Sequence, residues 1–137
     1  MSSEKHRGDA ARWALQAQAD VRAAQASRAA GAYEWACFQA QQAAEKAVKA
    51  VWLHLSEDPW GHSVFKLIDE LTEPPRGDLL SRFGVAAKQL DKLYVPTRYP
   101  NGLPELTPHE AFSDQDAAEA IQLAEAIVDG CAELTDS

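Results

Sequence analysis

One segment of the sequence combines side chains that suit a nucleotide. Residues 92–102 read KLYVPTRYPNG, which places Arg98 between Tyr94 and Tyr99 on a stretch stiffened by two prolines. A guanidinium can grip a phosphate through two parallel hydrogen bonds, and a tyrosine ring can stack on a base. A second interpretation is structural: Arg98 would donate to helix-end carbonyls, and the tyrosines would pack against the protein. The sequence leaves both interpretations open.

A polar stripe near the middle of the chain is the second candidate. Its members recur at offsets of three, four and seven, and therefore share one side of a helix: Gln42, Glu45, Lys46 and Lys49. One interpretation is a binding site on this side of the helix. The simpler interpretation is a solvated helix face, on which Glu45 and Lys49 form an i,i+4 ion pair worth about 0.3 kcal/mol.

Histidine and cysteine chemistry is less well supported. The histidines do not pair with one another, or with Cys37 and Cys131, at the spacing of metal ligands, so we expect no metal site: His6, His54, His62 and His109. His62 and Ser63 stand at the predicted start of a helix, where a histidine is more often a cap or a packed side chain than an acid or base. The motifs GxGxxG, GxxxxGK[ST], HExxH, CxxC and GxSxG are absent, so we expect no cofactor.

Composition limits the class of protein and its partners. A chain of 137 residues, 46% of them apolar, suits one globular domain over residues 1–137. The net charge is −8, so the molecule as a whole repels phosphate backbones; any nucleic-acid contact must be local, and we expect no DNA specificity. No long apolar run or export signal is evident, and two apolar-face cysteines fit reduced thiols. We therefore expect a cytoplasmic protein without a membrane segment.

Helical periodicity covers most of the chain. Apolar residues recur every three or four positions in five segments: residues 3–30, 33–55, 63–73, 78–94 and a last helix that begins after Ser113. Gly31 fits the αL residue that ends the first helix, and Asp78 fits the N-cap of the fourth, which should stop near Tyr94. Residues 95–112, with four prolines, are the one long irregular segment that we expect. The predicted fold is an all-α, antiparallel up-and-down bundle of four to five helices.

Four stretches together make the sequence recognisable: FQAQQAAEKAVK (38–49), GHS (61–63), LDKLY with TRYP (90–94 and 97–100) and DAAEA (116–120). In their order and spacing they resemble the HEPN family. The resemblance implies a helical bundle that is often a homodimer, in a bacterium or archaeon. It also implies a frequent nucleotidyltransferase partner, in pairs often described as toxin and antitoxin.

Many HEPN proteins are metal-independent ribonucleases, with an Arg, a polar residue and a His four to six residues further on, assembled across the dimer. No Arg in this sequence has a His at that spacing, and the nearest pair, Arg98 and His109, has ten intervening residues. The group that carries over better is a nucleotide-binding or partner-binding surface: Lys46, Lys49, His62, Tyr94, Arg98 and Tyr99. Tyr94 and Tyr99 are also candidate acceptors of a transferred nucleotide, by analogy with partnered members.

Three functions follow as expectations. The first is a module that binds a nucleotide or RNA, or that docks on a nucleotidyltransferase. The second is a ribonuclease toxin, in which Arg98 stabilises the developing charge on phosphorus and His109 or His62 moves protons. The third is a structural bundle that dimerises through a face of small residues, with the residues around Arg98 serving as a clamp.

Overall fold

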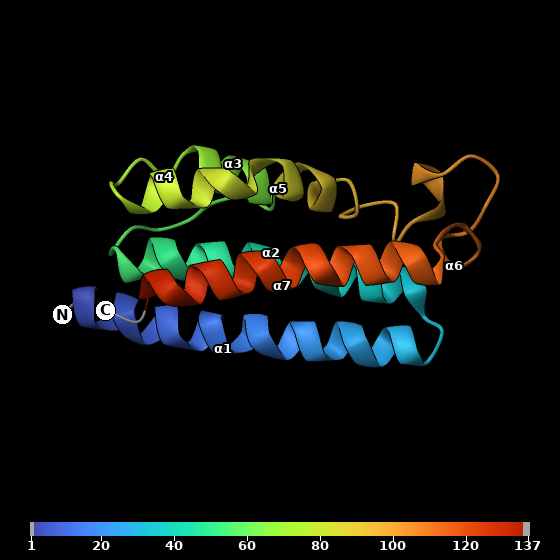
Figure 1. Cartoon of the computed structure of the whole chain (residues 1–137), viewed down its shortest axis with the longest axis horizontal. Helices are drawn as coiled ribbons and strands as arrows, with labels where there is room; N and C mark the ends of the chain where they lie inside the picture. Colours follow the sequence, from blue (N-terminus) through green and yellow to red (C-terminus); the bar gives the residue numbers. More distant parts are fainter. Residues whose placement is uncertain (1, 136–137) are drawn as a thin grey trace.

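Three long helices form the framework of the protein. The computed structural model describes residues 2–135, which contain no β-strand, and its long helices are α1 (Ser2–Ala29), α2 (Tyr33–His54) and α7 (Asp114–Thr135). In Figure 1 α2 and α7 run opposite to α1 and lie side by side. The segment from α4 to α5 runs back above them, so the long elements alternate in direction. This is the predicted all-α, up-and-down bundle.

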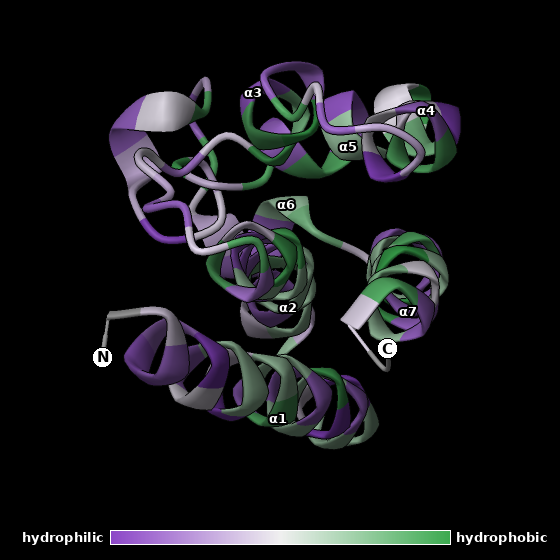
Figure 2. Cartoon of the chain, turned by 90° about the vertical axis from the view of Figure 1, so that its left-hand side faces the viewer, coloured by the Kyte–Doolittle hydropathy of each residue, from purple (hydrophilic) through white to green (hydrophobic). Residues whose placement is uncertain are grey.

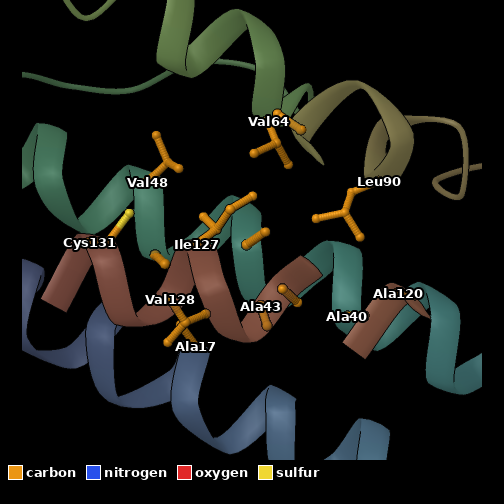
Figure 3. Close-up of a cluster of buried hydrophobic side chains, with 14 of the residues drawn as sticks. Ala17, Ala40, Ala43, Val48, Val64, Leu90, Ala120, Ile127, Val128 and Cys131 are labelled. Carbon is orange, nitrogen blue, oxygen red and sulfur yellow. The ribbon is translucent and has the colours of Figure 1, made fainter. Parts of the chain in front are cut away.

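Small residues hold the long helices close together. Gly31 has φ +82, which confirms the predicted αL residue between α1 and α2 and lets the chain reverse there. The core between α1, α2 and α7 is rich in alanine, with Ala17, Ala40 and Ala120 among its members (Figure 3). Because helix separation depends on the side chains at the contact, alanine allows the backbones to approach closely. Figure 2 shows the apolar faces turned toward one another.

The second layer is built from short helices, and here one prediction is wrong. The layer contains α3 (Val64–Asp69), α4 (Arg76–Leu80), a 3-10 turn η1 (Ser81–Phe83) and α5 (Gly84–Asp91). The expected single helix over 78–94 is therefore broken, and α5 ends at Asp91, three residues before Tyr94. Asp78 is not its N-cap, because α4 already begins at Arg76, after Pro75.

Local side-chain bonds explain the break. Ser81 Oγ donates to the carbonyl of Asp78 at 2.6 Å, and Arg82 Nε donates to that of Leu79 at 3.0 Å. Such bonds compete with the regular helical ladder and favour a tighter turn.

Two single-turn helices interrupt the segment before α7. They are η2 (Pro100–Gly102) and α6 (Pro108–Ala111), the latter held by a capping box between Thr107 and Glu110. The prediction of one long irregular segment over 95–112 is thus correct only in part. Ser113 Oγ accepts from the Asp116 N–H at 3.2 Å, which confirms the predicted start of α7. Within residues 2–135, none of the helices has the length and apolarity needed to cross a membrane.

Candidate functional site

The polar stripe on α2 is largely covered, with Glu45 and Lys49 buried and Gln42 and Lys46 half-buried, which contradicts its interpretation as a solvated face. Glu45 is 4% exposed and Lys49 is 8% exposed, and the two form an ion pair of 3.1 Å. The ring of Trp13 on α1 lies 5.7 Å from the Lys49 ammonium, and the segment around His62 covers Glu45 from the other side. Neither neighbour is close to the stripe in the sequence, so periodicity alone could not reveal this cover.

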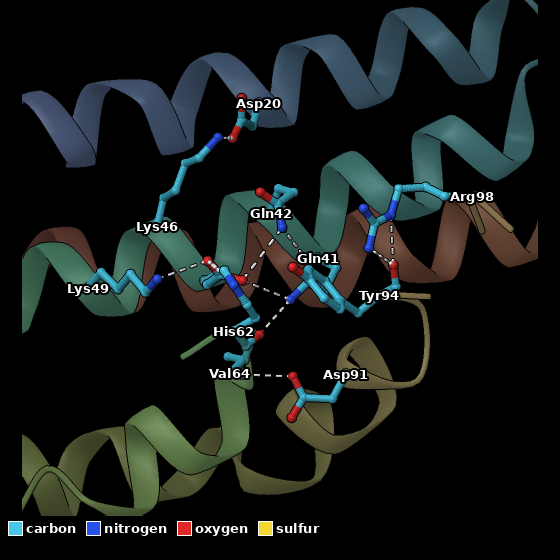
Figure 4. Close-up of polar contacts among 11 residues, drawn as sticks. Asp20, Gln41, Gln42, Lys46, Lys49, His62, Val64, Asp91, Tyr94 and Arg98 are labelled. Atoms are coloured by element: carbon cyan, nitrogen blue, oxygen red, sulfur yellow. Dashed lines mark hydrogen bonds and ion pairs between the residues drawn. The ribbon is translucent and has the colours of Figure 1, made fainter. Parts of the chain in front are cut away.

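Glu45 is the centre of this buried network, shown in Figure 4. Its carboxylate accepts from Lys49 Nζ at 3.1 Å and from Gln41 Nε2 at 3.3 Å, and it lies 3.4 Å from His62 Nδ1. Gln41, which is fully buried, also donates to the His62 carbonyl at 3.0 Å. A buried carboxylate requires such partners, because an unpaired charge in the interior is strongly destabilising. The network therefore fixes the segment around His62 against α2.

Asp91 fixes the same segment from the second layer. Its carboxylate accepts from Ser63 Oγ at 2.6 Å, from the Val64 N–H at 2.6 Å and from the Phe65 N–H at 3.1 Å. The two N–H groups are otherwise unsatisfied donors at the start of α3, where Ser63 is the N-cap; the sequence placed this helix start at His62 or Ser63. Asp91 thus joins the end of α5 to the start of α3, next to His62.

His62 and Tyr94 form an aromatic pair beside this network. Their ring centroids are 5.0 Å apart with an interplanar angle of 16°, and the His62 side chain is 61% exposed. The two residues come from different parts of the sequence, one before α3 and the other after α5. Stacking therefore holds the two rings against each other, while the His62 ring remains largely exposed to solvent.

Arg98 is held against the same aromatic group. Its Nε and Nη2 donate to the Tyr94 carbonyl at 2.9 and 2.7 Å, and its Cζ lies 4.4, 4.6 and 5.1 Å from the ring centroids of Phe38, Tyr94 and Tyr99. These are the bonds expected of a structural clamp. These bonds use the Nε and Nη2 edge of the guanidinium, which a phosphate bound through two hydrogen bonds at Nε and Nη2 would need. Nη1 donates to no acceptor within residues 2–135. The positive charge is therefore fixed in place, half-buried, beside Tyr99, which is 52% exposed.

Lys46 lies apart from the other predicted residues. Its ammonium pairs with Asp20 on α1 at 2.6 Å, and its stem lines a surface hollow of about 310 Å³ with Arg12, Trp13 and Gln16. The remaining predicted residues form one continuous series of contacts through Glu45 and Phe38: Lys49, His62, Tyr94, Arg98 and Tyr99.

His109 contacts the first turn of α2. Its Nδ1 lies 2.9 and 3.1 Å from the two carboxylate oxygens of Glu34, a residue that is 6% exposed, whereas the His109 side chain is 74% exposed. Because a carboxylate can only accept, Nδ1 carries the proton and Nε2 is the acceptor in the neutral ring. Glu34 lies one helical turn before Phe38, and the Arg98 guanidinium lies over the Phe38 ring. His109 and Arg98 thus lie against adjacent turns of α2.

Several organising residues were not among those predicted from the sequence. The missed residues Glu34, Phe38 and Gln41 share one face of α2, at steps of four and three residues, with the predicted residues Glu45 and Lys49, and we call these five residues the α2 site face. Asp91 was also missed. The helical spacing of these polar residues on a largely buried helix was an available signal, but their partners come from distant segments.

The cysteines do not contribute a nucleophile. Burial, with smaller effects from Asp116 and Glu34, raises the pKa of Cys37 from its ordinary value of 9.0 to about 12, and burial also raises the pKa of Cys131. Both thiols are therefore protonated at neutral pH. Among residues 2–135, no group of three His, Cys, Asp or Glu side chains could hold a metal ion.

Known proteins share this architecture. TT1696 from Thermus thermophilus has a TM-score of 0.84 at 40% sequence identity, and the match covers 91% of this chain and 97% of that one. ST0689, an archaeal HEPN homologue, has a TM-score of 0.76 at 35% identity, with coverages of 93% and 98%. A HEPN domain protein from Thermotoga maritima has a TM-score of 0.65 at 30% identity, with coverages of 90% and 96%.

A comparison with curated proteins finds no significant match. The family model of the HEPN domain, however, matches residues 10–134, which include the α2 site face, His62 and the segment around Arg98. The match extends over nearly the whole described chain. The chain belongs to the HEPN family.

Proposed function

We propose that this HEPN protein binds a nucleotide, or a short stretch of RNA, on the surface formed by His62, Tyr94, Arg98 and Tyr99, which we call the His62–Tyr99 surface. One observation carries the proposal. The His62 ring is stacked on Tyr94, and the Arg98 guanidinium is held 4.6 Å from the centroid of that same ring. A fixed cation beside exposed aromatic rings is the arrangement that accepts a base and its phosphate without sequence readout.

The geometry defines how such a ligand would bind. The base stacks on His62 or Tyr99, whose rings are more than half exposed. The phosphate faces Arg98 through Nη1, because Nε and Nη2 already donate to the Tyr94 carbonyl. Lys49 balances the Glu45 charge, so the Arg98 charge is not cancelled within the network. Arg98 thus supplies a fixed positive charge at this surface, on a chain whose net charge is −8.

Calorimetry with ATP, GTP and a short RNA tests the proposal. Arg98→Ala should weaken binding about tenfold or more, since it removes a charge-assisted contact and loosens Tyr94. Arg82→Ala is a matched control, because Arg82 also lies over an aromatic ring, at 5.9 Å from Phe83, and also donates to a main-chain carbonyl. Its effect on affinity should be negligible. Tyr99→Leu, which leaves the Arg98 clamp bonds in place, should weaken binding as well.

Absence of binding by the unaltered protein would refute this function. Equal affinities of the Arg98→Ala variant and the unaltered protein would move the site elsewhere on the molecule. Thermal melts of each variant separate a lost contact from lost folding.

A metal-independent ribonuclease is the second candidate, and the pair of His109 and Glu34 favours it. A buried carboxylate that holds Nδ1 of an exposed histidine leaves Nε2 to accept a proton, as general base catalysis requires. Arg98 lies over Phe38, one turn along α2, where it can stabilise developing charge on phosphorus. Labelled RNA in EDTA should then be cut by the unaltered protein and spared by His109→Ala. Intact RNA in both reactions would eliminate this candidate.

Docking on a nucleotidyltransferase is the third candidate, and exposed apolar side chains favour it. Trp35, Val95 and Tyr99 are 50%, 45% and 52% exposed, and Trp35 packs edge-on against Phe38 at 6.2 Å. Large exposed aromatic residues of this kind often anchor protein interfaces. Trp35→Ser should therefore abolish co-elution of this protein with a co-expressed minimal nucleotidyltransferase. Co-elution that survives the substitution would contradict this use of the surface.

A further inference from the structure

A surface hollow lies between α1 and α2, beside the buried Glu45–Lys49 pair. It has a volume of about 310 Å³ and is lined by Arg12, Trp13, Gln16 and Lys46. Trp13 supplies a half-buried indole, and Arg12 and Lys46 supply positive charge at its margin. A planar ring flanked by cations is the same combination that the His62–Tyr99 surface offers.

Successive contacts connect the two places. The Trp13 ring centroid lies 5.7 Å from Lys49 Nζ, which lies 3.1 Å from Glu45, whose carboxylate lies 3.4 Å from His62. Figure 4 shows Lys46 extending from α2 toward Asp20 on α1, His62 at the opposite edge of α2, and Arg98 beside a more distant turn of α2. Phe38, beneath Arg98, and Lys49, beside Trp13, are separated by eleven residues of α2, or about 16 Å at 1.5 Å per residue.

We propose that the hollow around Trp13 is a second nucleotide subsite, so that the ligand is a single-stranded oligonucleotide laid along α2. This proposal rests on the proposed function of the His62–Tyr99 surface and specifies the size of its ligand. One base stacks on Trp13 and another on the His62–Tyr99 surface. Since a strand advances at least about 3.4 Å per nucleotide, 16 Å corresponds to no more than about five nucleotides.

The ion pairs of the hollow are compatible with an incoming phosphate. Arg12 pairs with Asp9, and the Arg12 side chain is 77% exposed, so this pair is weak and exchanges readily. Lys46 pairs with Asp20 at 2.6 Å, which holds the ammonium over the hollow when no ligand is present. A phosphate replaces Asp9 as the partner of Arg12, whereas Lys46 keeps its pair with Asp20, whose side chain is only 13% exposed. Binding at the Trp13 subsite should consequently weaken as salt rises.

A length series tests the inference. The assay is fluorescence anisotropy with labelled single-stranded RNA of one to eight nucleotides. Affinity should rise about tenfold or more up to a length of four or five nucleotides and then stay constant. The second stacked base strengthens binding, whereas further bases have no ring on which to stack. Trp13→Leu should remove this gain, and a mononucleotide should still bind at the His62–Tyr99 surface. Arg12→Gln, at an exposed position that should not affect folding, should reduce the gain. Arg22→Gln, an equal loss of charge at an exposed position on another side of α1, should not.

The outcomes distinguish the two proposals. If a mononucleotide binds and longer strands bind no better, the second subsite is refuted and the first site stands. A length gain that survives Trp13→Leu refutes the subsite as well. If no length binds, the proposed function fails and this inference fails with it.

Discussion

Replacement of Glu45 by alanine should cost the protein more stability than any surface substitution. Glu45 is 4% exposed, and its loss leaves the Lys49 ammonium, 8% exposed, without a carboxylate partner. Breaking a buried ion pair by removing one member costs about 3–5 kcal/mol. The lower end applies here, because the Trp13 ring lies 5.7 Å from the ammonium and offers a weak substitute. We expect a loss of about 3 kcal/mol, or about 10 °C in Tm for a chain of this size.

A double substitution separates the charge effect from loss of packing. In Glu45→Leu with Lys49→Met, both charges are replaced by apolar groups of similar volume, and such a change is often neutral or stabilising. We expect the free energy of unfolding of the double variant to differ from that of the unaltered protein by no more than about 1 kcal/mol. Arg28→Gln is the control, because it breaks the Arg28–Asp114 ion pair of 2.8 Å, which lies at the surface. It should leave Tm close to its original value.

Urea unfolding followed by circular dichroism measures these differences, provided that the m-value stays constant. A cost of less than about 1 kcal/mol for Glu45→Ala, the range of exposed pairs, would refute the role of the buried ion pair. A double variant as unstable as Glu45→Ala would refute it too, because the cost would then come from packing or from the lost contact with His62 rather than from a stranded charge.

Three further predictions follow from single contacts. Asp91→Ala should lower the free energy of unfolding by about 2–4 kcal/mol, because it leaves three donors at the start of α3 without their acceptor. The control Asp78→Ala should change the free energy of unfolding by less than about 0.5 kcal/mol. Urea titrations in which Asp78→Ala is the more destabilising variant would contradict the capping role of Asp91. Because burial raises the pKa of Cys37 from 9.0 to about 12, the folded state favours the protonated thiol. This contribution is complete below about pH 9 and is lost as pH rises toward 12, so Cys37→Ala should flatten the alkaline fall in stability, and an unchanged slope would oppose it. Gly8→Ala should stabilise α1 by about 0.5–1 kcal/mol, because nothing lies near the added Cβ. Gly77→Ala should destabilise the protein, because the added Cβ would lie 2.3 Å from the Leu71 carbonyl oxygen. Equal melting temperatures for the two variants would contradict this contrast.

Local signals predicted most of the framework correctly and failed where neighbouring side chains decide the backbone. Gly31 and Ser113 act through backbone geometry or bonds within three residues, and their roles were predicted correctly, whereas the cap of α3 was predicted only as His62 or Ser63. The apolar spacing after Asp78 is continuous, yet Ser81 bonds back to the preceding turn and breaks the helix. Periodicity records which residues face the core, but it does not record such a competing bond.

The sequence was sufficient to predict which residue types make up the candidate site, but not which of them are buried. The sequence identified Lys49, His62 and Arg98 as a group, and the structure connects them through the α2 site face. It could not show that Trp13 covers Lys49, since that contact depends on how α1 packs across α2. A stripe of alternating charge normally indicates solvent exposure, and only tertiary packing reverses that expectation.

The two buried carboxylates of α2 have a common arrangement that stability alone does not explain. Glu34 holds Nδ1 of His109, and Glu45 lies next to Nδ1 of His62; in both cases the acid is buried and the histidine is more than half exposed. Apolar residues at these two positions would avoid the desolvation that each carboxylate suffers. What a buried acid provides instead is a fixed orientation and tautomer for the exposed imidazole, one on each side of the Arg98 guanidinium along the helix. The α2 site face is therefore better understood as a device that orients surface histidines and an arginine than as part of the hydrophobic core.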